Sequence, residues 1–223
     1  MSEELLPRGI IVSIQGYRAQ TMSELAQEAI NGGAVGIRTD KSLRLDGGKS
    51  VPIIGLHKTD VVDVKTEAYI TPTVEEVRSV QGWANLVAID YRSLNPNLQK
   101  VSRYCRERKL LVVADIETYE DFENLCDHGF YYTYVATTLA VFRLPFRPNL
   151  RLVEKIGKRE RNLIAEGNFS SRRDVQDAFE CGAHAVCIGG AISNVYKLTR
   201  RYTRPWAGPT LAENGQLEKQ VNA

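Results

Sequence analysis

The stretch Leu110-Leu111-Val112-Val113-Ala114-Asp115-Ile116 decides the fold class of this chain. Its apolar residues follow one another without alternation, which is typical of a strand buried on both faces in a parallel sheet covered by helices. Strands in a meander of hairpins would alternate apolar and polar residues. Short runs rich in Val, Ile and Ala recur along the sequence at residues 9–15, 33–38, 51–58, 84–91, 130–138, 161–166 and 183–191. Together with 110–116, they predict eight parallel strands.

Helix start and stop signals lie between these runs, where parallel strands need crossover connections. The start signals have capping-box spacing or an N-cap residue before proline: Thr21 to Glu24, Thr118 to Asp121, Ser171 to Asp174, Asn95-Pro96 and Thr71-Pro72. Gly129 and Gly182 stand where a helix end favours a left-handed residue. Only a short or irregular helix fits residues 40–50. Alternating strand and helix units predict an α/β protein, a (β/α)8 TIM barrel.

Length and composition indicate a single domain. With 223 residues, 43% hydrophobic and 25% charged, the chain resembles an ordinary globular protein at the compact end of the barrel class. We expect the barrel to span residues 1–203. We expect residues 204–223, which include Pro205 and Pro209, to form a loose carboxyl-terminal tail.

Charge balance and cysteine spacing restrict the partners and the compartment. The net charge of +2 gives no strong field for attracting nucleic acid. The sequence has no apolar run of membrane-spanning length, and its amino terminus lacks the apolar core of a signal peptide. The four cysteines show no Cys-x-x-Cys spacing: Cys105, Cys126, Cys181 and Cys187. We therefore expect a cytoplasmic protein that binds neither nucleic acid nor membrane, and we leave open whether it forms a homo-oligomer.

Polar residues end most of the apolar runs. In a barrel of this kind the working residues sit at the carboxyl ends of the strands, because the loops there converge on one mouth. These positions are held by Gln15, Arg38, Lys58, Asp90, Asp115, Thr137, Thr138, Glu166 and the pair Gly189-Gly190. We expect them to surround a site for a small molecule.

Two glycine turns are candidates for binding a phosphate. Gly189-Gly190-Ala191 follows the eighth run and precedes a helix, so its backbone N–H groups can approach an anion. Glu166-Gly167-Asn168 supplies a matching turn after the seventh run, and phosphate sites after strands seven and eight are frequent in barrels. The alternative is that each is a simple tight turn.

Lys58 and Glu166 are the candidates for proton transfer. Lys58 closes the run Ile53-Ile54-Gly55-Leu56-His57, and partial desolvation of its amine would lower the pKa towards that of a base. Burial of Glu166 at the same mouth would raise its pKa towards that of a general acid. The alternative for both residues is a structural ion pair, including one with each other.

The histidines and the remaining motifs give weaker signals. We expect His57, His128 and His184 to have core or surface roles, since inward and outward positions alternate along a strand and His128 lies at a helix end. The sequence contains no Ser-His-Asp order, no Gly-x-x-x-x-Gly-Lys loop and no pair of ligands with zinc spacing. We therefore expect no bound metal.

From about residue 8 to 203 the sequence resembles the N-acetylmannosamine-6-phosphate 2-epimerases of bacterial amino-sugar catabolism. The resemblance rests on matching motifs at strand ends: residues 11–15 (IVSIQ), 32–38 (GGAVGIR), 52–58 (PIIGLHK), 114–116 (ADI), 137–139 (TTL), 164–168 (IAEGN) and 189–192 (GGAI). It implies a barrel that inverts carbon 2 between N-acetylmannosamine 6-phosphate and N-acetylglucosamine 6-phosphate.

The resemblance also implies roles for individual residues. Lys58 would be the proton-transferring base and Glu166 its acid/base partner. Substrate-binding roles fall to Gln15, Arg38, Asp115, Thr138, Gly167, Asn168, Gly189 and Gly190. Because cationic and hydrogen-bonding side chains can stabilise the anionic intermediate, no metal or organic cofactor is implied.

The sequence departs from the family pattern in two places. Where the family continues with Thr-Arg-Pro, this chain has Ser193-Asn194-Val195, so an arginine expected near the phosphate is missing. Where the family has Gly-Tyr-Thr, this chain has residues 140–143 (AVFR). Other cations that could fill the missing arginine's role are Arg143, Arg147 and Arg200.

Two other functions remain open. One is a sister epimerase or isomerase that acts on a different phosphorylated or nucleotide-linked sugar. The other is a non-catalytic barrel that senses a sugar phosphate. The presence of both Lys58 and Glu166 argues against the sensor, because ligand binding alone does not need that pair.

Overall fold

Eight parallel strands form a closed barrel in the computed structural model, which describes residues 6–45, 51–143, 146–196 and 198–199. Each strand pairs with its neighbours in the sequence, and the first strand pairs with the last. The strands are β1 (Gly9–Ile14), β2 (Gly36–Thr39), β3 (Ile53–Gly55), β4 (Leu86–Asp90), β5 (Leu111–Asp115), β6 (Tyr134–Ala136), β7 (Leu163–Glu166) and β8 (Ala185–Ile188). All eight predicted runs are confirmed as strands, and the predicted TIM barrel is confirmed.

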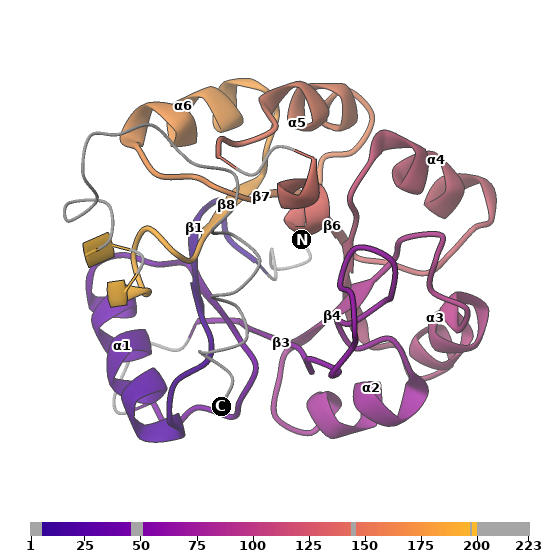
Figure 1. Cartoon of the computed structure of the whole chain (residues 1–223), viewed down its shortest axis with the longest axis horizontal. Helices are drawn as coiled ribbons and strands as arrows, with labels where there is room; N and C mark the ends of the chain where they lie inside the picture. The colour runs from indigo at the N-terminus through magenta and orange to yellow at the C-terminus, as the bar shows by residue number, and fades with distance from the viewer. Residues whose placement is uncertain (1–5, 46–50, 144–145, 197, 200–223) are drawn as a thin grey trace.

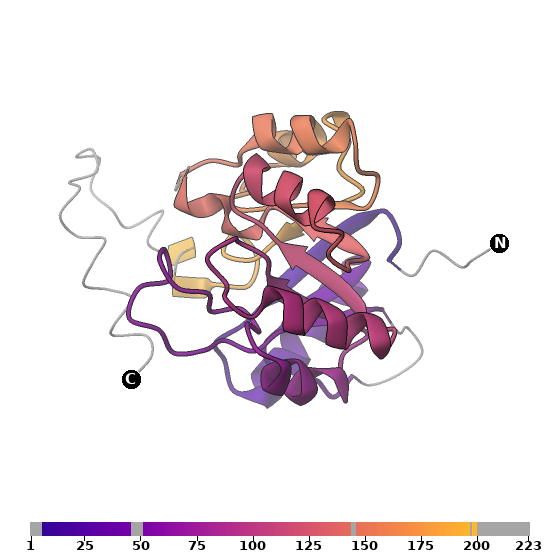
Figure 2. The same cartoon turned by 90° about the vertical axis from the view of Figure 1, so that its right-hand side faces the viewer.

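Helices surround the strands (Figure 1) and lie along the outside of the barrel in the side view (Figure 2). They are α1 (Ala19–Asn31), α2 (Val74–Gln81), α3 (Leu98–Glu107), α4 (Tyr119–Asp127), α5 (Leu150–Gly157) and α6 (Arg172–Glu180), with a 3₁₀ helix η1 (Thr138–Phe142) before α5. No helix of membrane-spanning length and apolarity occurs in the described ranges. Residues 40–45 form no helix, and residues 46–50 and the expected tail at 204–223 lie outside the described residues.

Several of the predicted helix signals are confirmed. Thr118 with Asp121 and Ser171 with Asp174 form complete capping boxes at the starts of α4 and α6. Gly129 follows α4 with φ of 60°, and Gly182 follows α6 with φ of 97°, so both end their helices in the left-handed region.

Three predicted helix starts are wrong. Helix α1 begins upstream of Thr21, after Arg18, because its first turn must bury Met22 against β1 and β2. The Asn95 side chain does not cap α3: its amide donates to the Asp90 carbonyl, and its oxygen accepts from the backbone of Asn97.

The third wrong start is Thr71, which has φ of 46° and precedes the real N-cap. Its hydroxyl accepts the backbone N–H of His57 at 2.9 Å. The helix α2 begins instead at Val74, and its N-cap Thr73 forms a capping box with Glu76 that was not predicted.

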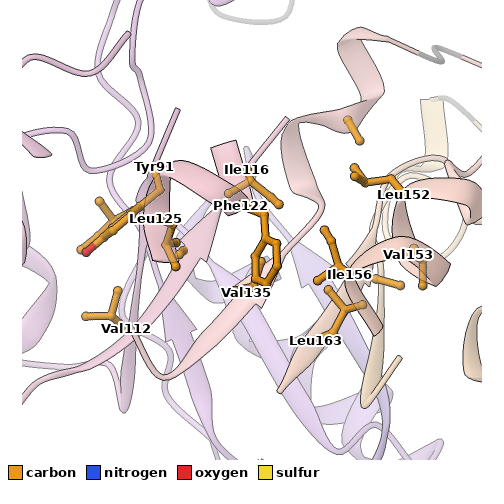
Figure 3. Packing of buried hydrophobic residues seen from close by; sticks show 14 of the residues in the cluster. Tyr91, Val112, Ile116, Phe122, Leu125, Val135, Leu152, Val153, Ile156 and Leu163 are labelled. Carbon is orange, nitrogen blue, oxygen red and sulfur yellow. The ribbon is translucent and has the colours of Figure 1, made fainter. Parts of the chain in front are cut away.

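Side chains alternate between the barrel interior and the helices. Inside, the strands contribute one cluster that includes Ile11, Ile54, Leu86, Val113 and Ile164. Between β4–β8 and the helices lies a second cluster, in which Val112, Phe122, Leu125, Val135, Ile156 and Leu163 pack together (Figure 3). The period of two that separates these clusters is the reason why every strand reads as continuously apolar.

The carboxyl ends of the strands break this apolar rule. At the inward positions of these ends, polar or charged side chains replace the apolar ones: Ser13, Arg38, Asp90, Asp115 and Glu166. Leu6 is fully buried in the interior cluster, and the ring of His184 contacts its carbonyl at 2.6 Å. The barrel is therefore filled with apolar side chains up to a polar layer at one end.

A matched pair of glycine substitutions tests the packing of α2 on β3. A Cβ at Gly55 would lie 2.5 Å from Ala84 Cβ and 2.6 Å from Val80 Cγ1, whereas a Cβ at Gly82 meets no atom within 4 Å. We expect Gly55→Ala to lower the free energy of unfolding by about 1–3 kcal/mol through overpacking. Gly82→Ala should leave it unchanged or raise it by up to about 1 kcal/mol. Urea denaturation of both variants measures the difference, and equal stabilities would contradict the packing.

Candidate active site

A cavity of about 280 Å³ opens at the carboxyl ends of the strands. The predicted site residues that line it are Gln15, Arg38, Lys58, Thr138, Glu166, Gly167, Asn168, Gly189 and Gly190. Asp115 lies behind this lining and is fully buried. The structure therefore brings the predicted site residues together at one mouth, although with Asp115 they come from seven different strands and the segments that follow them.

A buried ion pair between β2 and β5 forms the floor of the site. The Arg38 guanidinium contacts the Asp115 carboxylate with both terminal nitrogens, at 3.1 and 2.5 Å. The two side chains are 1% and 0% exposed. Burial of a paired charge is costly unless the geometry is good, and this paired two-point contact is the favourable case. The Nε atom of Arg38 is buried without a hydrogen-bond partner among the described residues.

The protonation of this pair follows from its environment. Burial lowers the pKa of Arg38, but the attraction of Asp115 and Glu166 outweighs it, so the pKa is raised and the guanidinium stays charged. Burial raises the pKa of the Asp115 carboxyl, and the Arg38 guanidinium opposes that effect.

Glu166 is held at the cavity by two threonines that precede and begin η1. The Thr137 hydroxyl donates to the Glu166 carbonyl at 2.9 Å and accepts the Glu166 backbone N–H at 3.0 Å. The Thr138 hydroxyl lies 3.1 Å from the Glu166 carboxylate and 2.7 Å from Asp115. The Glu166 carboxylate is 14% exposed and lies 3.5 Å from Arg38.

Thr138 therefore sits between two carboxylates. A hydroxyl carries one hydrogen and can accept others. When Thr138 donates to Asp115, which is the shorter contact, its oxygen is able to accept a hydrogen from a protonated Glu166. The arrangement accommodates Glu166 both as an acid and as a carboxylate.

Lys58 lies beyond the end of β3 and lines the same cavity as Glu166. Lys58 is exposed at the mouth although it lines the cavity, so the expected partial desolvation of its amine stays a prediction. Strand β3 ends at Gly55, so Lys58 belongs to the following loop, where it forms an antiparallel bridge with Ile70. The loop, and not the strand, sets the position of its amine.

The two predicted glycine turns both border the cavity. Gly167 has φ of 113° and Asn168 has φ of 59°, so this turn needs residues that tolerate the left-handed region. A Cβ at Gly167 would lie 3.0 Å from Val141 of η1. After β8, the backbone N–H groups of Ile192 and Ser193 both bond to the Gly189 carbonyl, which folds the chain back at the cavity edge.

Ser193 joins this second turn to β1. Its hydroxyl donates to the Ser13 carbonyl at 2.6 Å, and its own carbonyl accepts the Tyr17 hydroxyl at 2.7 Å. Gln15 donates to the Ser13 hydroxyl at 2.9 Å. This hydrogen bond to Ser13 of β1 orients the Gln15 side chain within the cavity.

The sequence-based interpretation missed several cavity residues. Ser13 and Cys187 occupy inward positions at the strand ends, so the period of two in β1 and β8 could have found them. Burial raises the pKa of the Cys187 thiol well above its usual value, as does the nearby Glu166. Tyr69 also lines the cavity, but it belongs to the loop after β3, whose path no local pattern predicts.

The remaining candidates that the structure describes are not among the lining residues. Asp90 pairs with Arg92 at 2.7 Å. Arg143 pairs with Glu117 at 2.6 Å, and Arg200 lies outside the described residues. Arg147 and the three histidines are not among the lining residues. Within the described part of the chain, no group of three or more His, Cys, Asp and Glu side chains could hold a metal ion.

Comparison with known proteins finds a family model and curated relatives of the same description. A family model described as "Putative N-acetylmannosamine-6-phosphate epimerase" matches residues 22–206. A "Putative N-acetylmannosamine-6-phosphate 2-epimerase" of Clostridioides difficile (strain 630) is 30% identical, covering 82% of this chain and 86% of that protein. One of the same description from Listeria monocytogenes serotype 4b (strain F2365) is 32% identical, covering 90% and 95%.

A solved structure is similar over the same extent. The N-acetylmannosamine-6-phosphate 2-epimerase from Clostridium perfringens superposes with a TM-score of 0.78 at 26% identity, covering 90% of this chain and 94% of that one. The residues matched by the family model include the cavity lining from Arg38 to Ala191.

Removing one partner of the buried ion pair tests its contribution to stability. Arg38→Met leaves the Asp115 carboxylate buried without its counter-ion, so we expect the free energy of unfolding to fall by about 3–5 kcal/mol. The double variant Arg38→Met with Asp115→Leu removes both charges and should recover most of this loss. Chemical denaturation of the single and double variants gives the coupling. Additive losses in the double variant would show that the pair does not act as a unit.

Proposed function

We propose that this chain, which belongs to the N-acetylmannosamine-6-phosphate epimerase family, inverts carbon 2 of N-acetylmannosamine 6-phosphate. The product is N-acetylglucosamine 6-phosphate. The family is one of isomerases. The observation that carries the proposal is the convergence of Lys58 and Glu166 on one cavity with Arg38 at its floor. We place the reaction in the cytoplasm, in keeping with four free cysteines.

Proton transfer at carbon 2 accounts for the two candidate catalytic residues. In the open-chain sugar the C2 hydrogen is alpha to the aldehyde. The neutral amine of Lys58 accepts that proton. The electron pair of the C–H bond forms a double bond between carbons 1 and 2, and the π pair of the carbonyl moves onto the aldehyde oxygen. Return of a proton to the opposite face of carbon 2 re-forms the aldehyde with inverted configuration. Glu166 acts as the acid/base partner in this exchange.

Arg38 supplies the charge that stabilises the intermediate. Removal of the C2 proton gives an enolate with its negative charge on the carbon 1 oxygen, because carbon 2 bears nitrogen. A fixed cation in a largely buried site stabilises such charge far better than water does. Arg38 lines the cavity, stays charged, and has its Nε donor unpaired among the described residues. We propose that this chemistry proceeds without a metal or organic cofactor.

Polar residues around the cavity hold the substrate. Gln15 and Thr138 offer hydrogen-bonding groups to the sugar, and Asp115 contributes through the orientation of Arg38. The two glycine turns bind the phosphate, with Gly167 and Asn168 on one side and residues 189–190 on the other. Their backbone N–H groups supply the contacts, as is frequent after strands seven and eight of barrels.

A sister epimerase or isomerase acting on a different sugar remains the second candidate. It is favoured by Asn194, which stands where the family carries an arginine. Among the described residues, the cavity is lined by two cations, Arg38 and Lys58, and Arg38 is already paired with carboxylates. A ligand with a differently placed anionic group would fit this charge distribution.

Replacement of Lys58 tests the mechanism. We expect Lys58→Ala to lower the rate of solvent deuterium incorporation at carbon 2 by on the order of 10²–10⁴-fold or more, because it removes the base. Proton NMR of the sugar phosphate in deuterated water measures the exchange. Lys100→Ala, on the exposed surface of α3, is the matched control and should exchange at the wild-type rate. Near wild-type exchange by Lys58→Ala would remove the mechanism.

Replacement of Glu166 tests whether this acid/base partner acts at carbon 2 or at the aldehyde oxygen. If Glu166→Gln incorporates deuterium without forming the epimer, Glu166 serves the opposite face of carbon 2. If exchange and epimer formation are lost together, Glu166 acts at the aldehyde oxygen, next to Arg38 and Thr138.

Restoring the missing arginine tests the substrate. A charge-assisted contact to phosphate contributes about 1.5–3 kcal/mol, or one to two decades in affinity. We therefore expect Asn194→Arg to bind N-acetylmannosamine 6-phosphate at least several-fold more tightly than the wild-type chain. Calorimetric titration of both proteins measures this, with the unphosphorylated sugar as the control ligand. Unchanged or weaker binding would favour the sister enzyme.

A further inference from the structure

We propose that Arg92 is a positioning residue for the reaction: its buried guanidinium holds the β3–α2 loop, residues 56–73, and thereby fixes Lys58 and Tyr69 at the cavity. Arg92 lies just after β4 and does not line the cavity. Its effect on catalysis rests on the proposed function of Lys58, whereas its effect on the loop does not.

The loop is closed at its base by backbone hydrogen bonds. The Thr59 N–H donates to the Tyr69 carbonyl at 2.9 Å, and the Thr71 N–H donates to the His57 carbonyl at 2.8 Å. Between these two bonds, Lys58 and Ile70 form an antiparallel bridge. The two sides of the loop therefore move together, and both contribute side chains to the cavity.

Hydrophobic burial does not hold the outer part of this loop. None of residues 60–68 is buried, and Val62 is completely exposed. A surface loop with few buried apolar contacts opens locally at low cost in free energy. Something else must hold it if Lys58 is to stay in place.

Arg92 supplies that attachment through three backbone carbonyls. Its Nη1 donates to the carbonyls of Val64 at 3.0 Å and Lys65 at 3.4 Å. Its Nη2 donates to the carbonyl of Glu67 at 2.9 Å. These carbonyls lie in the outer part of the loop, where burial gives no support.

The other donors of Arg92 fix it to the strand. Its Nε and Nη2 contact the two carboxylate oxygens of Asp90 at 3.0 and 2.7 Å. With these contacts all five N–H groups of the guanidinium have acceptors. Asp90 in turn accepts the Tyr69 N–H at 3.2 Å, so the pair grips the loop at its base as well as at its outer part.

Neighbouring loops enclose Arg92. Its side chain is 1% exposed, and the Phe142 ring lies over the guanidinium at 5.4 Å. The same ring lies 6.5 Å from the Tyr69 ring. Glu117 approaches Arg92 at 3.6 Å and also pairs with Arg143. Water cannot readily replace the contacts that Arg92 makes in this setting, which makes each of them costly to lose.

The shape of the arginine side chain is what the position requires. Lysine would keep the positive charge beside Asp90, but its ammonium has three donors at one point and cannot reach three loop carbonyls together with both carboxylate oxygens. Arg92→Lys therefore removes the loop attachment while the Asp90 charge stays paired.

Amide hydrogen exchange and kinetics on the same variant test the inference. In Arg92→Lys we expect amides of residues 59–71 to exchange on the order of ten-fold faster, with the rest of the barrel unchanged. We expect kcat for inversion at carbon 2 to fall about 10²-fold, because the base is displaced. KM should change little, since Gln15, Arg38 and the glycine turns belong to other strands. A merely structural role would not split kcat from KM in this way.

Two further variants complete the test. Arg106→Lys is the matched control, because Arg106 donates to the Gly129 carbonyl on the outside of the barrel; it should leave both measurements at wild-type values. Phe142→Ala uncovers Arg92 without removing a charge and should loosen the same loop by a smaller factor, which keeps the test available if Arg92→Lys does not fold.

The outcomes separate this inference from the proposed function. Wild-type kcat in Arg92→Lys, or loop amides as protected as in the wild type, would overturn it. A wild-type protein that exchanges no C2 hydrogen of N-acetylmannosamine 6-phosphate would refute the proposed function instead. Faster exchange confined to residues 59–71 in Arg92→Lys would still support Arg92 as the residue that holds the loop.

Discussion

The contact between Arg38 and Asp115 joins β2 to β5 inside the barrel and is the interaction on which the polar end depends. Below it the interior is apolar, and above it the cavity opens. Neither charge is stable there alone, so each residue requires the other, and the pair also orients Thr138 and Glu166. The Arg38 guanidinium contacts the carboxylates of both Asp115 and Glu166. Glu166 therefore lies close to a positive charge at the cavity.

Much of the fold could be predicted because strands in a closed parallel barrel are buried on both faces, which produces the same continuous apolar run eight times. Helix starts were harder. Thr21, Thr71 and Asn95 carry good local signals, but burial of Met22 lengthens α1, and loop contacts recruit the other two side chains. Local capping chemistry decides a helix start only where tertiary packing does not oppose it.

The candidate site could be predicted as far as strand topology determines it. Arg38, Asp115 and Glu166 lie at or next to the ends of their strands and face inward, so their convergence follows from the barrel alone. Lys58 does not follow from the barrel, because β3 ends three residues before it and the loop carries it into an exposed position. Tyr69 and Arg92 were missed for the same reason: the path of residues 56–73 depends on long-range contacts to carbonyls, which have no signature in side-chain patterns.

The contacts of Arg92, Glu117 and Arg143 connect the loops that follow β3, β4, β5 and β6. Barrels of this class are regarded as modular, since each loop at the mouth can vary while the scaffold persists. Here hydrogen bonds and ion pairs connect four neighbouring loops. A substitution in one loop therefore changes the energetic effect of substitutions in the others. Divergence of specificity on this side of the mouth must proceed through coordinated changes, and transplanting a single loop from a relative would fail unless its ionic partners came with it.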